Sequence, residues 1–267
     1  MAASLLKGTA FISGAASGIG QYTALAFARH GVRNLALADV NLAALQAANK
    51  KLQAAYPGVE VLPLQMDVQQ YDQVKAGIAA TVARFGRLDI AVNNAGIGGS
   101  GKPTHEVDEE EWRRVINIDL DGVWRCQREE LAVMVKQEDL GPREGRGRII
   151  NTASMFGIVA PGTLMSHTAY AAAKHGVVGL TKGDGNTYGA HNIRVNAICP
   201  GYVETPLLLA SMSTDPNSPL SIDVQRTPLK RMCKMDEIAD AVVFLASPMS
   251  SFMQGAALIA DGGFSTQ

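Results

Sequence analysis

Tyr170 and Lys174 are residues whose types and spacing suggest acid–base chemistry. They lie four residues apart in a segment with a helical pattern, so both side chains project from one helix face. A free tyrosine is a poor base at neutral pH, because its pKa is about 10. A nearby ammonium group stabilises the phenolate, and lowering the pKa by about three units takes roughly 4 kcal/mol. The pair predicts a tyrosine that moves a proton on a substrate oxygen. The alternative is a chance pair on a solvated helix face.

A glycine-rich segment, Ser13 to Gly20, reads Ser-Gly-Ala-Ala-Ser-Gly-Ile-Gly and follows an apolar run with strand character. Glycines there let the backbone turn tightly and approach a phosphate, whose charge then meets a helix N-terminus. Asp39 stands 19 residues after Gly20, at the end of the next predicted strand. A carboxylate at that point can accept hydrogen bonds from an adenosine ribose. The two features together predict a dinucleotide site, whereas a glycine cluster alone fits an ordinary turn equally well.

Asp39 also bears on the choice of nucleotide. A 2′-phosphate would lie against its carboxylate, and like charges at that distance repel. The following residues, Val40 and Asn41, carry no positive charge, and neither do residues 15–17. We therefore expect NAD(H) to be favoured over NADP(H). Arg33 is the one nearby cation that could reverse this preference.

Strand-like and helix-like segments alternate along the chain, which favours an α/β fold with a doubly wound parallel sheet. The predicted strands are short and mostly apolar, as in parallel sheets covered on both faces: Thr9–Ser13, Asn34–Ala38, Val59–Met66, Leu88–Asn93, Arg148–Thr152, Arg194–Cys199 and Ala256–Ala260. The predicted helices are Gln21–Arg29, Leu42–Ala55 with Asn41 as N-cap, Gln70–Arg84, two within Glu109–Val135, Tyr170–Tyr188 and Asp236–Ala246. No interdomain linker is evident, so residues 1–267 are expected to form one domain.

Two segments interrupt this alternation. Glu138–Gly147 is charged and contains glycine and proline, which predicts a surface loop. Tyr202–Leu229 holds four prolines and no strand pattern. Long irregular segments in compact domains often act as functional lids, so we expect a substrate lid over about residues 202–229.

Composition excludes several classes of protein. The 267 residues are 47% hydrophobic and 18% charged, with a net charge of −1, so neither a disordered chain nor a general nucleic-acid binder is expected. Neither a signal-peptide core nor a membrane-length apolar run is present. Three separated cysteines, Cys126, Cys199 and Cys233, suggest a reducing compartment, and no His or Cys spacing matches a metal site. We expect a cytoplasmic protein without a metal.

Several motifs occur in a fixed order: Ser-Gly-x-x-x-Gly-Ile-Gly at 13–20, Asn-Asn-Ala-Gly at 93–96, Ser154, Tyr170-Ala-Ala-Ala-Lys174 and Pro200-Gly201. Together they resemble the short-chain dehydrogenase/reductase family, in its single-domain branch. The resemblance runs from about Thr9 to Gly263. It implies a Rossmann-type sheet of about seven parallel strands, a nicotinamide cofactor, and hydride transfer between an alcohol and a carbonyl.

The same resemblance implies roles for individual residues. Asp67 and Val68 are similar to the pair beside the adenine ring, and Thr205 is similar to the threonine that holds the nicotinamide carboxamide. The implied cofactor-binding residues are Gly14, Ser17, Gly18, Ile19, Gly20, Asp39, Asp67, Val68, Asn94, Ala95, Gly96, Tyr170, Lys174, Pro200, Gly201, Val203 and Thr205. The implied catalytic residues are Asn117, Ser154, Tyr170 and Lys174. Asp261-Gly262-Gly263 resembles the closing turn of the family.

Two of these assignments leave alternatives open. Ser154 is expected to hydrogen-bond the substrate oxygen beside Tyr170, and Thr152 is its near competitor. Asn117 resembles the asparagine that holds a water beside the catalytic lysine, although an asparagine that merely kinks its helix fits too. Between Ser154 and Tyr170 lie 15 residues, more than is usual in the family. The extra residues, around 161–167, are expected to reshape one wall of the pocket or to form a surface bulge.

The expected substrate is a neutral, hydrophobic small molecule, for which a ring-containing alcohol or ketone is one candidate. The predicted lid carries the apolar run 206–212, and the loops that face it carry Ile97, Met155, Phe156, Leu164, Met165 and Tyr202. No Arg or Lys is placed to clamp a phosphate or carboxylate. The lid leucines could instead pack on the protein's own core.

Residues 183–185 and the choice between redox and non-redox chemistry each allow two interpretations. Residues 183–185, Gly-Asp-Gly, are unusual inside a predicted helix, because each glycine costs around 1 kcal/mol relative to alanine. Such small residues would permit close helix packing in a homodimer or homotetramer, or simply weaken the helix. The leading function is an NAD(H)-dependent oxidoreductase. The alternative is a protein of the same fold with a non-redox role, such as a cyclase, a dehydratase or a nucleotide-binding module.

Overall fold

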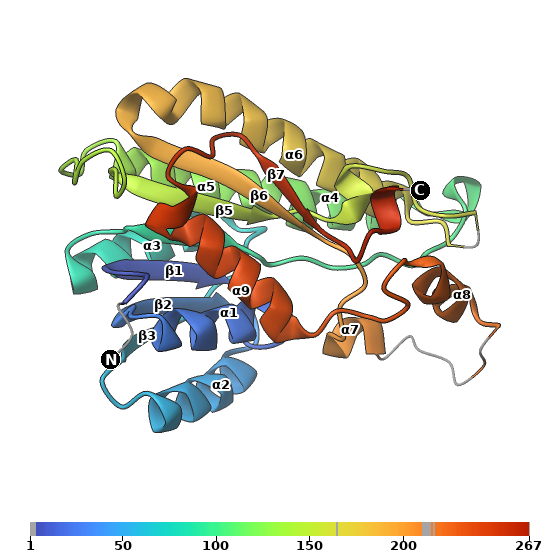
Figure 1. Ribbon diagram of the computed structural model, residues 1–267, viewed down its shortest axis with the longest axis horizontal. Helices are drawn as coiled ribbons and strands as arrows, with labels where there is room; N and C mark the ends of the chain where they lie inside the picture. The colour runs from blue at the N-terminus through green and yellow to red at the C-terminus, as the bar shows by residue number, and fades with distance from the viewer. Residues whose placement is uncertain (1–3, 164, 210–214, 216, 267) are drawn as a thin grey trace.

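A single seven-stranded parallel sheet forms the centre of the computed structural model, which describes residues 4–163, 165–209, 215 and 217–266 (Figure 1). The strand order is β3-β2-β1-β4-β5-β6-β7. The strands are β1 (Thr9–Ser13), β2 (Asn34–Asp39), β3 (Glu60–Gln65), β4 (Ile90–Asn93), β5 (Gly147–Thr152), β6 (Ile193–Pro200) and β7 (Ala257–Ala260). Every neighbouring pair is parallel, which confirms the predicted Rossmann-type fold.

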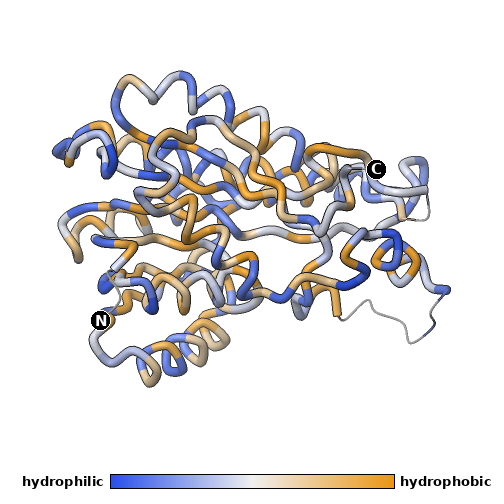
Figure 2. Tube along the Cα trace, viewed as in Figure 1, coloured by the Kyte–Doolittle hydropathy of each residue, from blue (hydrophilic) through white to orange (hydrophobic). Residues whose placement is uncertain are grey.

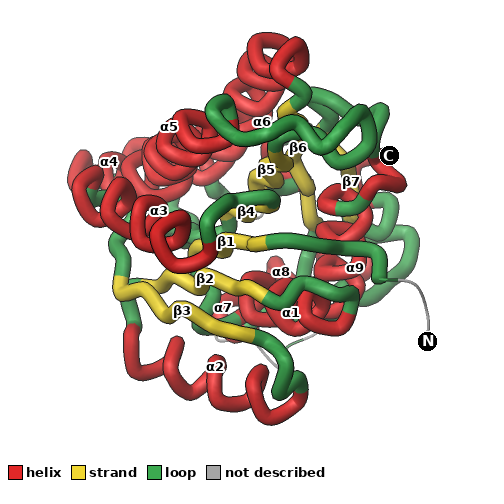
Figure 3. The backbone as a smooth tube through the Cα atoms, turned by 90° about the vertical axis from the view of Figure 1, so that its left-hand side faces the viewer, coloured by secondary structure: helices red, strands yellow, loops and turns green. Residues whose placement is uncertain are grey.

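Helices cover both faces of the sheet, as Figure 3 shows. One face carries α1 (Gly18–Arg29), α2 (Leu42–Ala55) and α9 (Met235–Ala246). The other carries α3 (Tyr71–Phe85), α5 (Gly122–Met134) and α6 (Thr168–Tyr188). The central strands β1, β4, β5 and β6 are buried along their whole length, as expected for parallel strands covered on both faces, whereas β3 and β7 at the edges are partly exposed.

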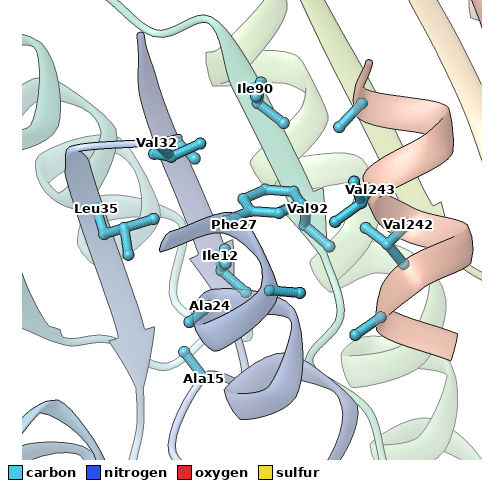
Figure 4. Close-up of a cluster of buried hydrophobic side chains, with 14 of the residues drawn as sticks. Ile12, Ala15, Ala24, Phe27, Val32, Leu35, Ile90, Val92, Val242 and Val243 are labelled. Atoms are coloured by element: carbon cyan, nitrogen blue, oxygen red, sulfur yellow. The ribbon is translucent and has the colours of Figure 1, made fainter. Parts of the chain in front are cut away.

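Alternate side chains of each strand enter different cores. Ala10 and Ile12 of β1 pack with α1 and α9, whereas Phe11 between them packs with α3 and α5. Figure 4 shows the first of these cores, in which the Phe27 ring of α1 lies among strand residues and the valines of α9. In Figure 2 the hydrophobic colour follows the central strands accordingly. Because successive side chains of a strand point to opposite faces, one sheet can pack against helices on both sides.

Several boundaries agree with the sequence patterns. β1 and α2 have the predicted limits, and the Asn41 side chain caps α2 by accepting a hydrogen bond from the Ala44 nitrogen at 3.0 Å. Helix α1 differs, because it begins at Gly18 rather than Gln21. The glycine motif therefore forms the first turn of the helix as well as the loop before it. Residues 138–146 form the expected surface loop.

The predicted two helices of residues 109–135 are present, joined by an unusual turn. α4 (Glu109–Ile116) passes into a π-helical turn at Asn117–Asp121, and α5 follows directly. π-helical turns inside α-helices are rare and occur often at functional sites.

The expectation of an irregular segment at 202–229 needs correction. It contains two short helices, α7 (Pro206–Leu209) and α8 (Pro219–Arg226). Ser218 caps α8 through its side chain, and Pro219 occupies the first turn, where a missing N–H costs nothing.

Among the residues described, no helix is long and apolar enough to cross a membrane.

Candidate active site

A cavity of about 890 Å³ opens at the carboxyl ends of the central strands. Its lining begins with the turn after β1 and extends to Leu220 of α8. Ligands of open α/β sheets bind at this edge, where the strand order reverses, because the loops there diverge. The reversal here lies between β1 and β4.

The glycine turn has the shape of a phosphate cradle. Gly14 and Gly18 have φ angles of +66° and +56°, which other residues rarely adopt. A Cβ atom at Gly14 would lie 2.8 Å from the Ala95 Cα, and one at Gly20 would lie 2.2 Å from the Gly14 carbonyl oxygen. These glycines therefore let the turn pack closely on the loop after β4 and on α1, whose N-terminus is where a pyrophosphate would bind.

A serine ties this turn to the next loop. Ser13 Oγ accepts hydrogen bonds from the backbone nitrogens of Asn94 at 3.0 Å and Ala95 at 3.2 Å. The Asn94 side chain donates in return to the carbonyl oxygens of Ser13 and Gly14. The two loops that a dinucleotide would span are thus one hydrogen-bonded unit.

Asp39 lies at the end of β2 and lines the cavity with Asp67 and Val68. Its carboxylate accepts hydrogen bonds from the backbone nitrogens of Ala16 and Asn41, each at 3.0 Å. Arg33 precedes the opposite end of β2, where its guanidinium donates to the carbonyl oxygens of residues 28 and 32. Lys174 is the only Lys or Arg among the described residues that line the cavity.

The predicted reacting residues come together at the other end of the cavity. Ser154 follows β5 and accepts a hydrogen bond from the Phe156 nitrogen at 3.1 Å. Lys174 Nζ lies 5.4 Å from the centroid of the Tyr170 ring, one helical turn away on α6. Thr152 also reaches the cavity, but its hydroxyl lies 3.4 Å from Asn94 Oδ1. Ser154, Tyr170 and Lys174 can therefore act on one substrate oxygen.

The expectation that Asn117 lies beside Lys174 is wrong. The Asn117 amide donates to Gln69 Oε1 at 3.2 Å and accepts from Arg125 at 2.7 Å, on a separate surface depression. The side chain beside Lys174 is that of Asp119, two residues further on, with 3.5 Å between Oδ2 and Nζ. The physical reason is helix geometry: residues two positions apart point to nearly opposite sides of a helix, so Asn117 faces away from Lys174 where Asp119 faces it. An acid within the apolar run Val-Ile-Asn-Ile-Asp-Leu was the overlooked signal.

Comparisons with known proteins agree with this geometry. A family profile described as Enoyl-(Acyl carrier protein) reductase matches residues 14–265. Levodione reductase of Leifsonia aquatica is 39% identical over 256 residues, covering 94% of this chain and 92% of the relative. Cis-4-hydroxycyclohexanecarboxylate dehydrogenase of Sinomonas cyclohexanicum is 39% identical over 255 residues, covering 96% and 95%. The crystal structure of levodione reductase matches with a TM-score of 0.88 at 38% identity, covering 97% of this chain and 98% of the other.

The chain belongs to the short-chain dehydrogenase/reductase family. The family uses the nicotinamide cofactor NAD(P)(H), and these relatives are named as a reductase and a dehydrogenase. The chain is therefore an oxidoreductase of this kind. All predicted cofactor residues of this short-chain dehydrogenase/reductase line the cavity except Gly20, which packs beneath Gly14.

The end of the cavity near Tyr170 is largely apolar and aromatic in this short-chain dehydrogenase/reductase. Phe156 lies 6.3 Å from Tyr202 and 6.4 Å from His167, between ring centroids. Burial lowers the pKa of His167, so its ring is neutral at neutral pH. Further lining comes from Ile97, Met155, Met165, Pro206, Leu207, Leu208 and Leu220. The predicted lining residues Leu164 and 210–212 lie outside the described residues.

The predicted closing turn is also present. A Cβ atom at Gly201 would lie 2.7 Å from the Asp261 Cα, so the loop after β6 packs directly on the turn after β7. The Asp261 carboxylate accepts hydrogen bonds from the nitrogens of Gly263 and Ser265. This contact supports the segment that carries Val203 and Thr205 into the cavity.

Proposed function

We propose that this protein is an NAD(H)-dependent dehydrogenase/reductase that acts on a secondary alcohol or ketone of a neutral, hydrophobic ring compound. The observation that carries the proposal is the convergence of Ser154, Tyr170 and Lys174 on a cavity that also contains the glycine turn. A binding module or a non-redox enzyme would not require all three groups at one oxygen.

The chemistry follows from these side chains. When bound, the nicotinamide supplies or takes up the hydride. Ser154 Oγ donates a hydrogen bond to the substrate oxygen and holds it beside the Tyr170 hydroxyl. In alcohol oxidation the Tyr170 phenolate removes the hydroxyl proton, and in ketone reduction the phenol returns it. The Lys174 ammonium lies within reach of the phenol ring and favours the phenolate.

Asp39 supports the preference for NAD(H). Its carboxylate lines the cavity at the end of β2, accepts a hydrogen bond from the Ala16 nitrogen, and is available to accept hydrogen bonds from an adenosine ribose. The Arg33 guanidinium is engaged at the far end of β2, so it does not neutralise this carboxylate. A 2′-phosphate would therefore meet a negative charge.

The substrate class is supported by the lining and by the relatives. The aromatic rings of Phe156 and Tyr202, with Met155 and Leu208, form a wall suited to a flat or puckered ring. Two relatives are named for levodione and a hydroxycyclohexane carboxylate, both ring compounds. For this chain we infer a neutral ring, because Lys174 is the only Lys or Arg in the described lining and is buried behind Tyr170.

The test measures oxidation and reduction of the nicotinamide through the absorbance of NADH or NADPH. Purified protein is assayed with NADH or NADPH against cyclic ketones, open-chain ketones and an enoyl thioester, with NAD⁺ and cyclic alcohols in reverse. We expect turnover with cyclic ketones and NADH, abolished in Tyr170→Phe. A preference for NADPH would overturn the assignment of NAD(H), and a preference for the enoyl thioester would overturn the assignment of a ketone or alcohol substrate. Binding of NADH without turnover would favour a non-redox role.

We also propose that the chain is a single cytoplasmic domain in which residues 202–229 form the substrate lid. We propose further that the protein forms a homodimer or homotetramer through α5 and α6. The side chain of Trp124 on α5 is exposed, and the Arg128 guanidinium lies 5.7 Å from its ring. Light scattering at micromolar concentration tests the assembly, and a monomer would contradict it.

A further inference from the structure

Lys174 does not face the cavity as an isolated cation. Its Nζ lies 3.5 Å from Asp119 Oδ2, and the side chains are 4% and 0% exposed. Asp119 Oδ1 accepts a hydrogen bond from the Ile97 nitrogen at 2.8 Å, whereas Oδ2 has no hydrogen-bond partner among the described residues. A Cβ atom at Gly96 would lie 3.2 Å from Oδ2 and 3.4 Å from Nζ. The loop after β4 therefore leaves room for the pair to meet.

The other groups around the pair are neutral. Cys199 of β6 faces Lys174, and burial raises the pKa of that thiol to about 11. His167 lies 6.5 Å from the Tyr170 ring, and burial lowers its pKa. From β5, the Thr152 carbonyl oxygen accepts a hydrogen bond from Nζ at 3.0 Å. Among the described residues, Asp119 is thus the charge that balances Lys174.

The two charges act on each other. Burial raises the pKa of Asp119, and the ammonium of Lys174 counteracts that rise. Burial alone would lower the pKa of Lys174, but the Asp119 carboxylate and Tyr170 raise it. The pair therefore carries a net charge near zero, where Lys174 alone would carry +1. A phenolate at Tyr170 gains less from a neutral pair than from a free ammonium.

We propose that Asp119 is a positioning residue that holds Lys174 beneath Tyr170 and offsets its charge, so that the tyrosine deprotonates at a higher pH than the lysine alone would allow. This inference rests on the proposed function, because it assigns Tyr170 the proton transfer. The charge of Asp119 thereby sets the pH at which alcohol oxidation reaches its full rate. Asp119 does not touch the substrate and acts through Lys174.

The test compares Asp119→Asn with Asp121→Asn. Asparagine keeps the shape and the acceptor for the Ile97 nitrogen, and Asp121 is a half-exposed acid of the same π-helical turn. Phenolate absorbance is titrated without cofactor or substrate, each protein being compared with its own Tyr170→Phe counterpart. We expect the Tyr170 inflection to fall by about one pH unit in Asp119→Asn and to stay in place in Asp121→Asn. An unchanged or higher inflection in Asp119→Asn would overturn the inference.

Activity gives a second, separate readout. The rising limb of alcohol oxidation against pH should move down by the same amount in Asp119→Asn. If no alcohol is oxidised by the wild type, the proposed function fails, while the phenolate titration still decides the charge balance. If Asp119→Asn does not fold, the double variant Asp119→Asn/Lys174→Met serves in its place. Its inflection should lie within about one unit of the wild type, and a rise of more than about two units would overturn the proposal.

Discussion

Lys174 Nζ donates a hydrogen bond to the Thr152 carbonyl oxygen at 3.0 Å, which joins α6 to the end of β5. Ser154 stands two residues further along the same chain segment. The bond uses a backbone atom of Thr152, so it does not depend on the threonine side chain. The serine and the lysine are therefore positioned from one strand end.

This arrangement distinguishes Ser154 from its near competitor. Ser154→Ala removes a hydrogen bond to the developing charge on the substrate oxygen, and such losses typically cost 10²- to 10³-fold in kcat. Thr152→Ala keeps the carbonyl that holds Lys174, so kcat should fall less than about fivefold if the threonine hydroxyl is no oxyanion donor. Steady-state kinetics of both variants on one ketone decide the matter, and the reverse ranking would assign the role to Thr152.

Removal of the Tyr170 hydroxyl should abolish proton transfer while leaving the fold intact. General acid–base catalysis contributes about 10²- to 10⁴-fold, so kcat of Tyr170→Phe should fall by at least that order. Cofactor affinity should change little, because one hydroxyl is lost. Tyr188→Phe, at the far end of the same helix, is the matched control and should retain activity. A Tyr170→Phe enzyme near wild-type activity would exclude the phenol as the acid.

Nucleotide preference should depend on Asp39. Asp39→Ala removes a charged acceptor for the ribose hydroxyls, and one such hydrogen bond is worth about 1.5–3 kcal/mol, so the Kd for NADH should rise at least roughly 10- to 100-fold. The Kd for NADPH should change little, because the repulsion of the 2′-phosphate disappears as well. Asp39→Asn keeps an acceptor for the Ala16 nitrogen but removes the negative charge. It therefore distinguishes the effect of the charge from the effect of losing the hydrogen bond that holds the glycine turn. Fluorescence titration gives both constants, and equal losses for both nucleotides would contradict the assignment.

Leu208 and Leu209 test the apolar lining in adjacent positions. Leu208 lines the cavity and packs with Phe156 and Tyr202, whereas Leu209 is 46% exposed and outside the lining. Leu208→Asp should raise KM for an apolar ketone at least tenfold with an unchanged Kd for NADH, and Leu209→Asp should do neither. If both substitutions raised KM equally, the effect would come from a loss of helix stability and not from contact between Leu208 and the ketone.

Glu130 should make the protein less stable as the pH rises. It is fully buried on α5, its Oε2 accepts a hydrogen bond from Asn93 at 3.0 Å, and burial raises its pKa to about 8. Between the unfolded pKa near 4.5 and the folded value, the native state binds the extra proton, so stability falls with pH by up to about 1.4 kcal/mol per unit. Glu130→Gln should remove this slope and raise Tm at pH 8.

The comparison for Glu130 is Glu110→Gln, which removes an exposed acid of α4. Chemical unfolding at pH 6, 7 and 8 would measure the slopes. We expect Glu110→Gln to follow the wild type, and a Glu130→Gln slope equal to that of the wild type would show that Glu130 does not bind the extra proton in the native state.

Local patterns in the sequence were sufficient for much of the fold and part of the site. β1 and α2 were predicted to the residue because a short apolar run and an Asn cap are signals within one segment. Tyr170 and Lys174 share a helix, so their spacing alone placed them together. α8 was missed because its prolines suggested irregular structure, although Ser218-Pro219 is a helix start.

Features that depend on tertiary contact were beyond such patterns. Helix α6 runs through Gly183 and Gly185 to Tyr188, as the pattern predicts, but the pattern does not show what Gly185 contacts. A Cβ atom at Gly185 would lie 2.8 Å from the Gly255 Cα, so the glycine admits another segment of the same chain. The position of Asp119 beside Lys174 likewise depends on the path of the helix, which no periodicity in the sequence reveals.

The π-helical turn at Asn117–Asp121 has a consequence for insertions and deletions. A π-helical turn accommodates one residue more than an α-helical turn, and each residue rotates an α-helix by about 100°. Deleting one residue from this turn would allow α4 and α5 to form a continuous α-helix. Asp119 would then rotate away from Lys174 although no residue type in the active site had changed. At this position a change in chain length, rather than a substitution, would be enough to remove the carboxylate that balances the charge of Lys174.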